Sequence, residues 1–264
     1  MGYSRSANLG KTGYQMSAEL KVLVKELGLL ASKLTKLPSG GIRLIGPDFD
    51  VCPEEFLEQA ENDYEAGGNA LMLNAISNAK RAINCQIAQA LVYYGFNIET
   101  GALKSEKKRR ELFEDLGFLA PRILRRVADA RNILEHEYRL PTSQQVEDAL
   151  DLAALFIEAT GRNLDIADTE FALGNEDEQI ENRDFFFTNQ LDVVFEPEEM
   201  HFQIQGRRGI PEDARRPLPV LKALIITRSD PVYTDLVRLT VAGDRPARVE
   251  HALDMFWASL EELL

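Results

Sequence analysis

The sequence is poor in cysteine and histidine, and this shortage limits the chemistry that the chain can perform. Cysteine occurs only at Cys52 and Cys85, and histidine only at His136, His201 and His251. Two isolated cysteines form neither a disulfide framework nor a cysteine-based metal site, which favours a reducing compartment. The sequence also has no glycine-rich phosphate loop, no supported Ser-His-Asp arrangement and no zinc-ligand spacing. We therefore expect no metal and no cofactor.

Long apolar runs are missing as well. No segment approaches the roughly 18 apolar residues that a membrane helix needs, and residues 1–12 lack the apolar core of a secretory signal. The expected location is the cytoplasm, with no membrane partner. The 264 residues carry a formal net charge of -13, which argues against a protein that coats nucleic acid non-specifically but allows a local basic surface.

The first 162 residues have the apolar spacing of helices separated by short breaks. Ser17, Pro53 and Thr142 stand at predicted helix starts, because such residues suit the first turn of a helix. The predicted helices cover residues 17–37, 53–66, 69–94, 121–134 and 143–160, and a basic segment covers residues 104–117. Alternation of helices and short breaks is typical of an antiparallel bundle.

The pattern changes after Arg162. Acidic residues dominate the next stretch, which is expected to be a solvated linker. Strand-like runs then follow, and a final amphipathic helix begins at Pro246. The predicted strands include residues 185–188, 191–195, 201–205, 220–227 and 236–241. We expect a mainly α chain, with a helical bundle over residues 1–162, an acidic linker over 163–182 and a small α+β module over 183–264.

The segment Arg131-Asn132-Ile-Leu-Glu-His136-Glu-Tyr138 carries the clearest chemical signal. The arginine guanidinium suits phosphate oxygens, and histidine is the side chain best matched to proton transfer near pH 7. Five residues along a regular helix correspond to about 140° of rotation. Arg131 and His136 are therefore expected to meet only where the helix ends or distorts, or between two chains.

This motif resembles the hallmark of the HEPN superfamily, in which an arginine is followed by four to six residues and a histidine. Asn132 after the arginine, and Tyr138 two residues after the histidine, also match. The resemblance implies an antiparallel HEPN-like bundle of four to five helices, a homodimer with the two motifs at its interface, and metal-independent RNA cleavage in toxin–antitoxin or defence systems. It further implies an antitoxin or nucleotidyltransferase partner, which in related toxins modifies the tyrosine with adenylate.

The expected reaction is attack of the RNA 2′-hydroxyl on the adjacent phosphorus. His136 would transfer protons, Arg131 would stabilise the phosphorane, and Asn132 and Tyr138 would orient the site or hydrogen-bond to it. Upstream basic residues would attract the RNA backbone. These expected RNA-binding residues are Lys107, Lys108, Arg109, Arg110, Arg122, Arg125 and Arg126.

Each feature also has an ordinary structural interpretation. Arg131 and His136 at a helix end would pair with backbone carbonyls, the basic segment would be a solvated face, and Tyr138 would be a packing residue. The acidic balance and the unexplained C-terminal module favour an alternative function. In that alternative the chain is a non-catalytic, HEPN-like dimerisation protein that recruits a partner through its C-terminal module.

Overall fold

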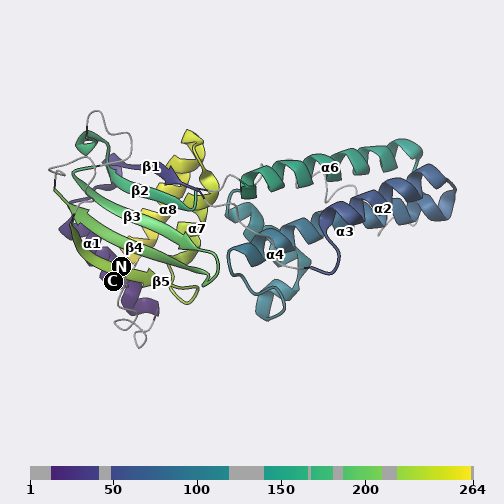
Figure 1. Cartoon of the computed structure of the whole chain (residues 1–264). Coiled ribbons are helices and arrows are strands. Elements are labelled where there is room, and N and C mark those ends of the chain that lie inside the picture. Colours follow the sequence, from purple (N-terminus) through teal and green to yellow (C-terminus); the bar gives the residue numbers. More distant parts are fainter. Residues whose placement is uncertain are drawn as a thin grey trace. The chain divides into compact units, whose positions relative to one another are not determined.

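The computed structural model describes residues 13–41, 49–118, 140–165, 168–180, 187–209 and 219–262, which fall into two compact units (Figure 1). The first, called the sheet unit, contains the described residues of 1–43 and 166–264. The second, called the helical unit, contains those of 44–165. The helical unit is therefore an insertion between two segments of the sheet unit.

The sheet unit is built on an antiparallel sheet whose strands follow one another in the order β1-β2-β3-β4-β5. The strands are β1 (Leu34–Gly40), β2 (Glu170–Asn175), β3 (Asn189–Glu196), β4 (His201–Arg208) and β5 (Val220–Ile226). The helices of this unit are α1 (Gly13–Glu26), α7 (Tyr233–Ala242) and α8 (Pro246–Glu262). Short 3-10 turns cover Ala31–Lys33 and Glu176–Glu178.

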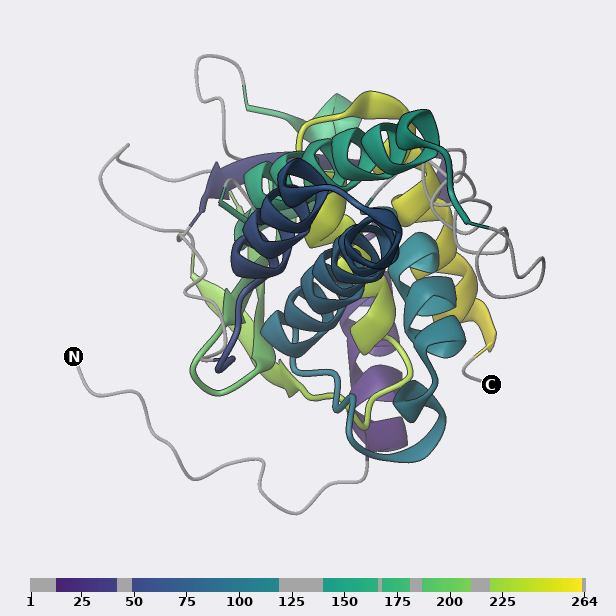
Figure 2. The same cartoon turned by 90° about the vertical axis from the view of Figure 1, so that its right-hand side faces the viewer.

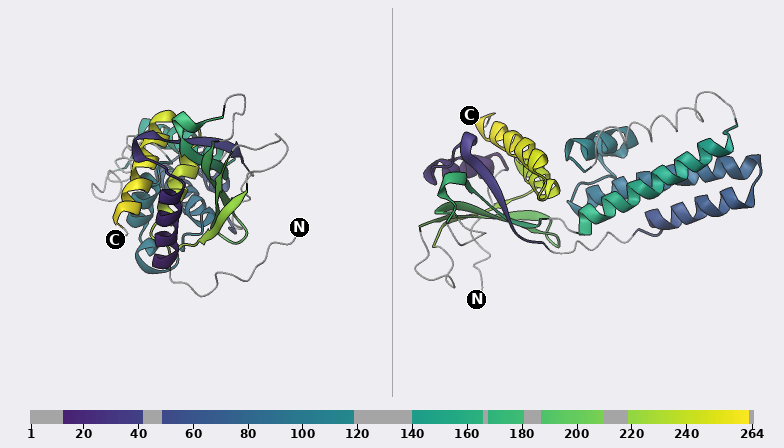
Figure 3. Two further views of the ribbon diagram at one scale, coloured as in Figure 1. Left: turned by 90° about the vertical axis from the view of Figure 1, so that its left-hand side faces the viewer. Right: turned by 90° about the horizontal axis from the view of Figure 1, so that it is seen from above.

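One face of this sheet carries the core. Leu191, Val193 and Phe195 of β3 are buried, as are their partners on β4, whereas the intervening Asp192 and Val194 are only partly buried. Figure 3 shows α1 and α8 on the same side of the sheet. Gly206 allows α1 to approach closely, because an added Cβ there would lie 2.6 Å from a methyl carbon of Leu23. The opposite face carries Gln203 and Gln205, which are only partly buried.

The helical unit is arranged around α3. Its helices are α2 (Pro53–Ala66), α3 (Asn69–Tyr93), α4 (Glu106–Asp115) and α6 (Ser143–Asp165), with a 3-10 turn at Gly101–Lys104. Helix α3 contacts α2, α4 and α6 (Figure 2). Phe113 of α4 stacks on Phe118 with ring centroids 4.6 Å apart, and on Phe156 of α6 at 5.7 Å. This aromatic cluster closes one end of the core.

Local signals determine where these helices begin. Before α2, the backbone N–H of Cys52 donates to Glu55 Oε2 over 2.8 Å, and Pro53 occupies the first turn. Before α6, the N–H of Thr142 donates to Gln145 Oε1 over 2.9 Å, and Gln145 N–H donates back to Thr142 Oγ1 over 3.3 Å. Both are capping boxes, and Pro53 and Thr142 were the sequence signals that predicted these two helix starts.

The expected fold class, a mainly α HEPN-like bundle followed by a small α+β module, is wrong. The structure is mixed α/β, with a five-stranded antiparallel sheet among the described residues. The expected domain of residues 1–162 coincides with neither unit, since α1 and β1 lie in the sheet unit. The expected linker over 163–182 contains β2, whose Phe171 and Leu173 are buried between two neighbouring strands.

Two element predictions fail for identifiable reasons. The expected helix over 17–37 ends at Glu26, because Gly28 adopts φ 70° and reverses the chain before β1. The expected strand over 236–241 is part of α7. Nearly every residue of α7 is buried, and a helix covered on all sides loses the amphipathic pattern that identifies a helix in a sequence.

Among the described ranges, no helix has both the length and the apolar content to cross a bilayer.

Candidate functional site

The basic segment expected to bind RNA lies on α4, and its charges are partly compensated there. Lys108 Nζ lies 2.7 Å from Glu111 Oε2, and Lys107 Nζ lies 3.9 Å from Glu111 Oε1. Arg109 donates to the carbonyl oxygens of Leu103 and Lys104 in the preceding turn. The lysine pairs are solvent-exposed and thus weak, so these two cations can exchange Glu111 for a phosphate. The guanidinium of Arg109, in contrast, already donates to backbone carbonyl oxygens and supports the turn before α4.

Arg110, the fourth predicted basic residue of this segment, is partly buried on α4. The other predicted site residues lie outside the described residues. They are Arg122, Arg125, Arg126, Arg131, Asn132, His136 and Tyr138. In the sequence they stand between α4 and α6, within the range of the helical unit.

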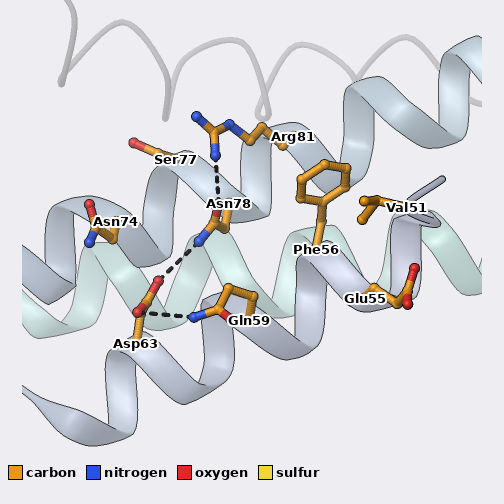
Figure 4. A pocket seen from close by; sticks show the side chains of 9 residues that line it. All are labelled: Val51, Glu55, Phe56, Gln59, Asp63, Asn74, Ser77, Asn78 and Arg81. Atoms are coloured by element: carbon orange, nitrogen blue, oxygen red, sulfur yellow. Dashed lines mark hydrogen bonds between the residues drawn. The ribbon is translucent and has the colours of Figure 1, made fainter.

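The described part of the helical unit contains a groove of about 570 Å³ between α2 and α3 (Figure 4). The two helices run side by side because Gly67 and Gly68, at φ 73° and 92°, make the tight reversal between them. The groove is lined by Val51, Glu55, Phe56, Gln59, Asp63, Asn74, Ser77, Asn78 and Arg81. Most of these side chains are polar, unlike the apolar contacts of α3 with the core.

A continuous hydrogen-bonded network crosses this groove (Figure 4). Asp63 of α2 accepts from Asn78 Nδ2 at 3.0 Å and from Gln59 Nε2 at 3.3 Å. The other end of the Asn78 amide, Oδ1, accepts from Arg81 over 3.2 Å. Asn78 is buried, and its amide orients both the carboxylate of Asp63 and the guanidinium of Arg81.

The other end of the groove is apolar. Phe56 and Val51 lie next to each other there, away from Asp63 (Figure 4). Glu55 belongs to the helix cap, and the hydrogen bond from the Cys52 backbone lowers the pKa of its carboxyl group. The arrangement thus offers an acceptor in the groove, a cation at the rim and an aromatic wall. It suits a flat, polar ligand with one apolar face.

The sequence-based prediction missed this groove, although a signal was present. Asn74, Ser77, Asn78 and Arg81 recur at i, i+3, i+4 and i+7 along α3 and form a polar stripe on one side of a mostly apolar helix. A polar stripe facing another helix needs partners, and Gln59 and Asp63 of α2 provide them.

Within the described ranges, no group of three or more His, Cys, Asp or Glu side chains is arranged to hold a metal ion.

Comparisons with family models, with curated proteins and with solved structures gave no match to this chain.

Proposed function

We propose that the chain is a metal-independent endoribonuclease of the kind that the HEPN resemblance implies, acting in toxin–antitoxin or phage-defence systems. One observation carries the proposal, namely the spacing of Arg131, His136 and Tyr138 within the sequence range of the helical unit. The polar groove of the same unit supports it, because it offers a place where part of an RNA strand can bind. The two cysteines are free in the structure, which suits the cytoplasmic location that we also propose.

In the proposed reaction, the 2′-oxygen of a ribose bonds to the adjacent phosphorus while the bond from phosphorus to the 5′-oxygen breaks. The products are a 2′,3′-cyclic phosphate and a free 5′-hydroxyl. His136 takes the proton from the 2′-hydroxyl, and a proton must also reach the leaving 5′-oxygen. Arg131 neutralises the charge that develops on the phosphorane. A homodimer would supply two histidines, one for each proton transfer.

The test is expression of the wild-type chain and of the Arg131→Ala/His136→Ala double variant in a bacterial host. We expect growth arrest and fragmented RNA with the wild-type chain only, and 2′,3′-cyclic phosphate ends on the fragments. Purified protein should cut RNA equally well with excess EDTA. Intact RNA with both chains, in cells and with purified protein, would refute the proposal. A co-expressed antitoxin or nucleotidyltransferase, if one exists, would suppress the arrest.

A non-catalytic role in partner binding is the second candidate, and one observation favours it. Val220, Leu221 and Ile225 of the edge strand β5 are 47%, 49% and 40% exposed. Exposed apolar side chains on an edge strand are unusual unless another chain covers them. Under this alternative the wild-type chain would leave RNA intact and bind a partner through the sheet unit.

A further inference from the structure

We propose that the groove between α2 and α3 is a subsite for a guanine base of single-stranded RNA. This assignment rests on the proposed function, since it identifies the nucleotide that the RNA-binding unit prefers. Its starting point is the volume of the groove, about 570 Å³, which falls in the range of ordinary small-ligand sites. A base with its ribose is a ligand of this class.

Asp63 is the group that selects the base. A carboxylate has about four acceptor positions, and among the described residues Gln59 and Asn78 each donate to one oxygen of Asp63. Acceptor capacity on both oxygens is therefore left for a ligand. Guanine presents two neighbouring donors, N1–H and the 2-amino group, which match the two oxygens of one carboxylate. Adenine, cytosine and uracil do not present two such donors side by side.

Arg81 and Phe56 complete the recognition. Arg81 is solvent-exposed and oriented by Asn78 Oδ1, so its guanidinium is positioned for a phosphate of the strand. Phe56 is partly buried in the wall of the groove, and an aromatic ring stacks on any base. Stacking and the phosphate contact provide affinity, whereas Asp63 provides the choice of base.

The buried Asn78 links the two charged groups of the site. Its amide donates to Asp63 and accepts from Arg81, so the same side chain orients both groups. A preorganised site of this kind rejects a ligand that lacks one donor, because an acceptor is then left without a partner.

The experiment compares three fluorescein-labelled hexanucleotides with the full wild-type chain, measured by fluorescence anisotropy. One is an adenosine hexamer with a single central guanosine, the second has inosine in its place, and the third has adenosine throughout. All riboses are 2′-O-methylated, so that attack by a 2′-hydroxyl cannot occur. Inosine lacks only the 2-amino group. We expect it to bind about 10- to 100-fold more weakly than guanosine, the range for one hydrogen bond to a charged group.

Two variants test whether Asp63 causes the difference in affinity between the guanosine and inosine strands. Asp63→Asn should greatly reduce the difference between guanosine and inosine, because the negative charge and one of the two acceptor oxygens are lost. Glu58→Gln makes the same charge change at an exposed α2 residue that does not line the groove, and it should keep the difference. Circular dichroism melting shows whether each variant is folded, while the inosine comparison needs no variant at all.

Equal affinity of the wild-type chain for the guanosine and inosine strands would overturn the proposal. So would an Asp63→Asn chain that discriminates between them as strongly as the wild-type chain does. Cleavage of unmodified RNA is measured separately. Guanosine preference without cleavage would keep the subsite and reject the nuclease, whereas cleavage without guanosine preference would do the reverse.

Discussion

Lys36 shows at the residue scale how a single side chain joins distant parts of the sheet unit. Its ammonium group donates to Asp168 Oδ2 at 2.8 Å and to the carbonyl oxygens of Leu239 and Gly243 at 2.8 and 3.0 Å. It also lies 4.9 Å from the ring centroid of Phe171. Burial lowers its pKa more than the hydrogen bond to Asp168 raises it. The lysine thus connects β1 to the C-terminal end of α7.

Replacement of this lysine should destabilise the fold. The Lys36 side chain is 1% exposed and that of Asp168 is 18% exposed, so Lys36→Met leaves a largely buried carboxylate and two carbonyl oxygens without their donor. We expect a loss of about 2–4 kcal/mol in the free energy of unfolding, measured by urea titration. Lys33→Met is the matched control, because the pair of Lys33 with Asp177 is exposed, and it should change little. Equal effects of the two variants would contradict this account.

Cys85 offers a test of burial within the helical unit. Burial, and to a smaller degree the nearby Cys52 and Glu54, raise the pKa of its thiol to about 11. Only the thiolate reacts with iodoacetamide. In a Cys52→Ser chain, alkylation of Cys85 should therefore be slow at pH 7 and accelerate about tenfold per pH unit up to about pH 11. In urea the same thiol should react at an ordinary rate. If the alkylation rate of the folded chain reached a plateau near pH 9, the pKa of Cys85 would not be raised by burial.

At the scale of elements, glycines decide how closely segments can pack. Gly174 of β2 lies against Phe187, which is fully buried and pairs with Gln179 across an isolated bridge. The N–H of Phe187 donates to Gln190 Oε1 over 2.9 Å, which positions the backbone from which the buried ring projects. This contact fastens the chain that leads from β2 to β3 onto the sheet.

Gly174→Ala should therefore be costly. The added Cβ would lie 2.2 Å from Cγ of Phe187, close to the ring's attachment rather than at a mobile tip. We expect a loss of about 1–3 kcal/mol, measured as a lower midpoint of thermal unfolding. Gly161→Ala in α6 meets nothing within 4 Å and should stabilise by about 0.5–1 kcal/mol through helix propensity. If Gly174→Ala left the midpoint of thermal unfolding unchanged, the contact between Gly174 and Phe187 would not be tightly packed.

At the scale of the whole molecule, the insertion of one unit into another follows from the pairing of β1 with β2. Gly40 pairs with Glu170 across these antiparallel strands, so the chain leaves the sheet unit and re-enters it at neighbouring points. An insertion whose ends lie close together does not disturb the host fold. The helical unit, with its own core around α3, is then free to vary independently of the sheet.

This topology predicts that the two units separate cleanly. A chain in which a short glycine-rich linker replaces residues 42–167 should fold, because the linker only has to join β1 to β2 as a hairpin does. Residues 49–165 should fold alone as a helical protein. Circular dichroism and cooperative thermal melting would check both chains. Aggregation or non-cooperative melting of the linked sheet unit would show that it depends on the insertion.

The sequence by itself determined the elements whose signals are local. The helices that start at Pro53 and Ser143 follow recognisable start signals, and α8 begins at Pro246 as expected. Apolar and polar residues alternate in β4, and β5 is a mostly apolar run, as expected for strands. The motif around Arg131 and His136 was also found in the sequence, and its role stays a prediction.

Tertiary structure decided the features that depend on contacts between distant residues. β1 is a strand because β2, more than a hundred residues later in the chain, pairs with it. α7 is a helix whose burial hides its period. The groove exists because the polar stripe of α3 meets Gln59 and Asp63 on α2. The physical reason is the same in each case, since a strand needs a partner strand and a polar side chain inside a fold needs a hydrogen-bonding partner. Neither partner can be read from local periodicity.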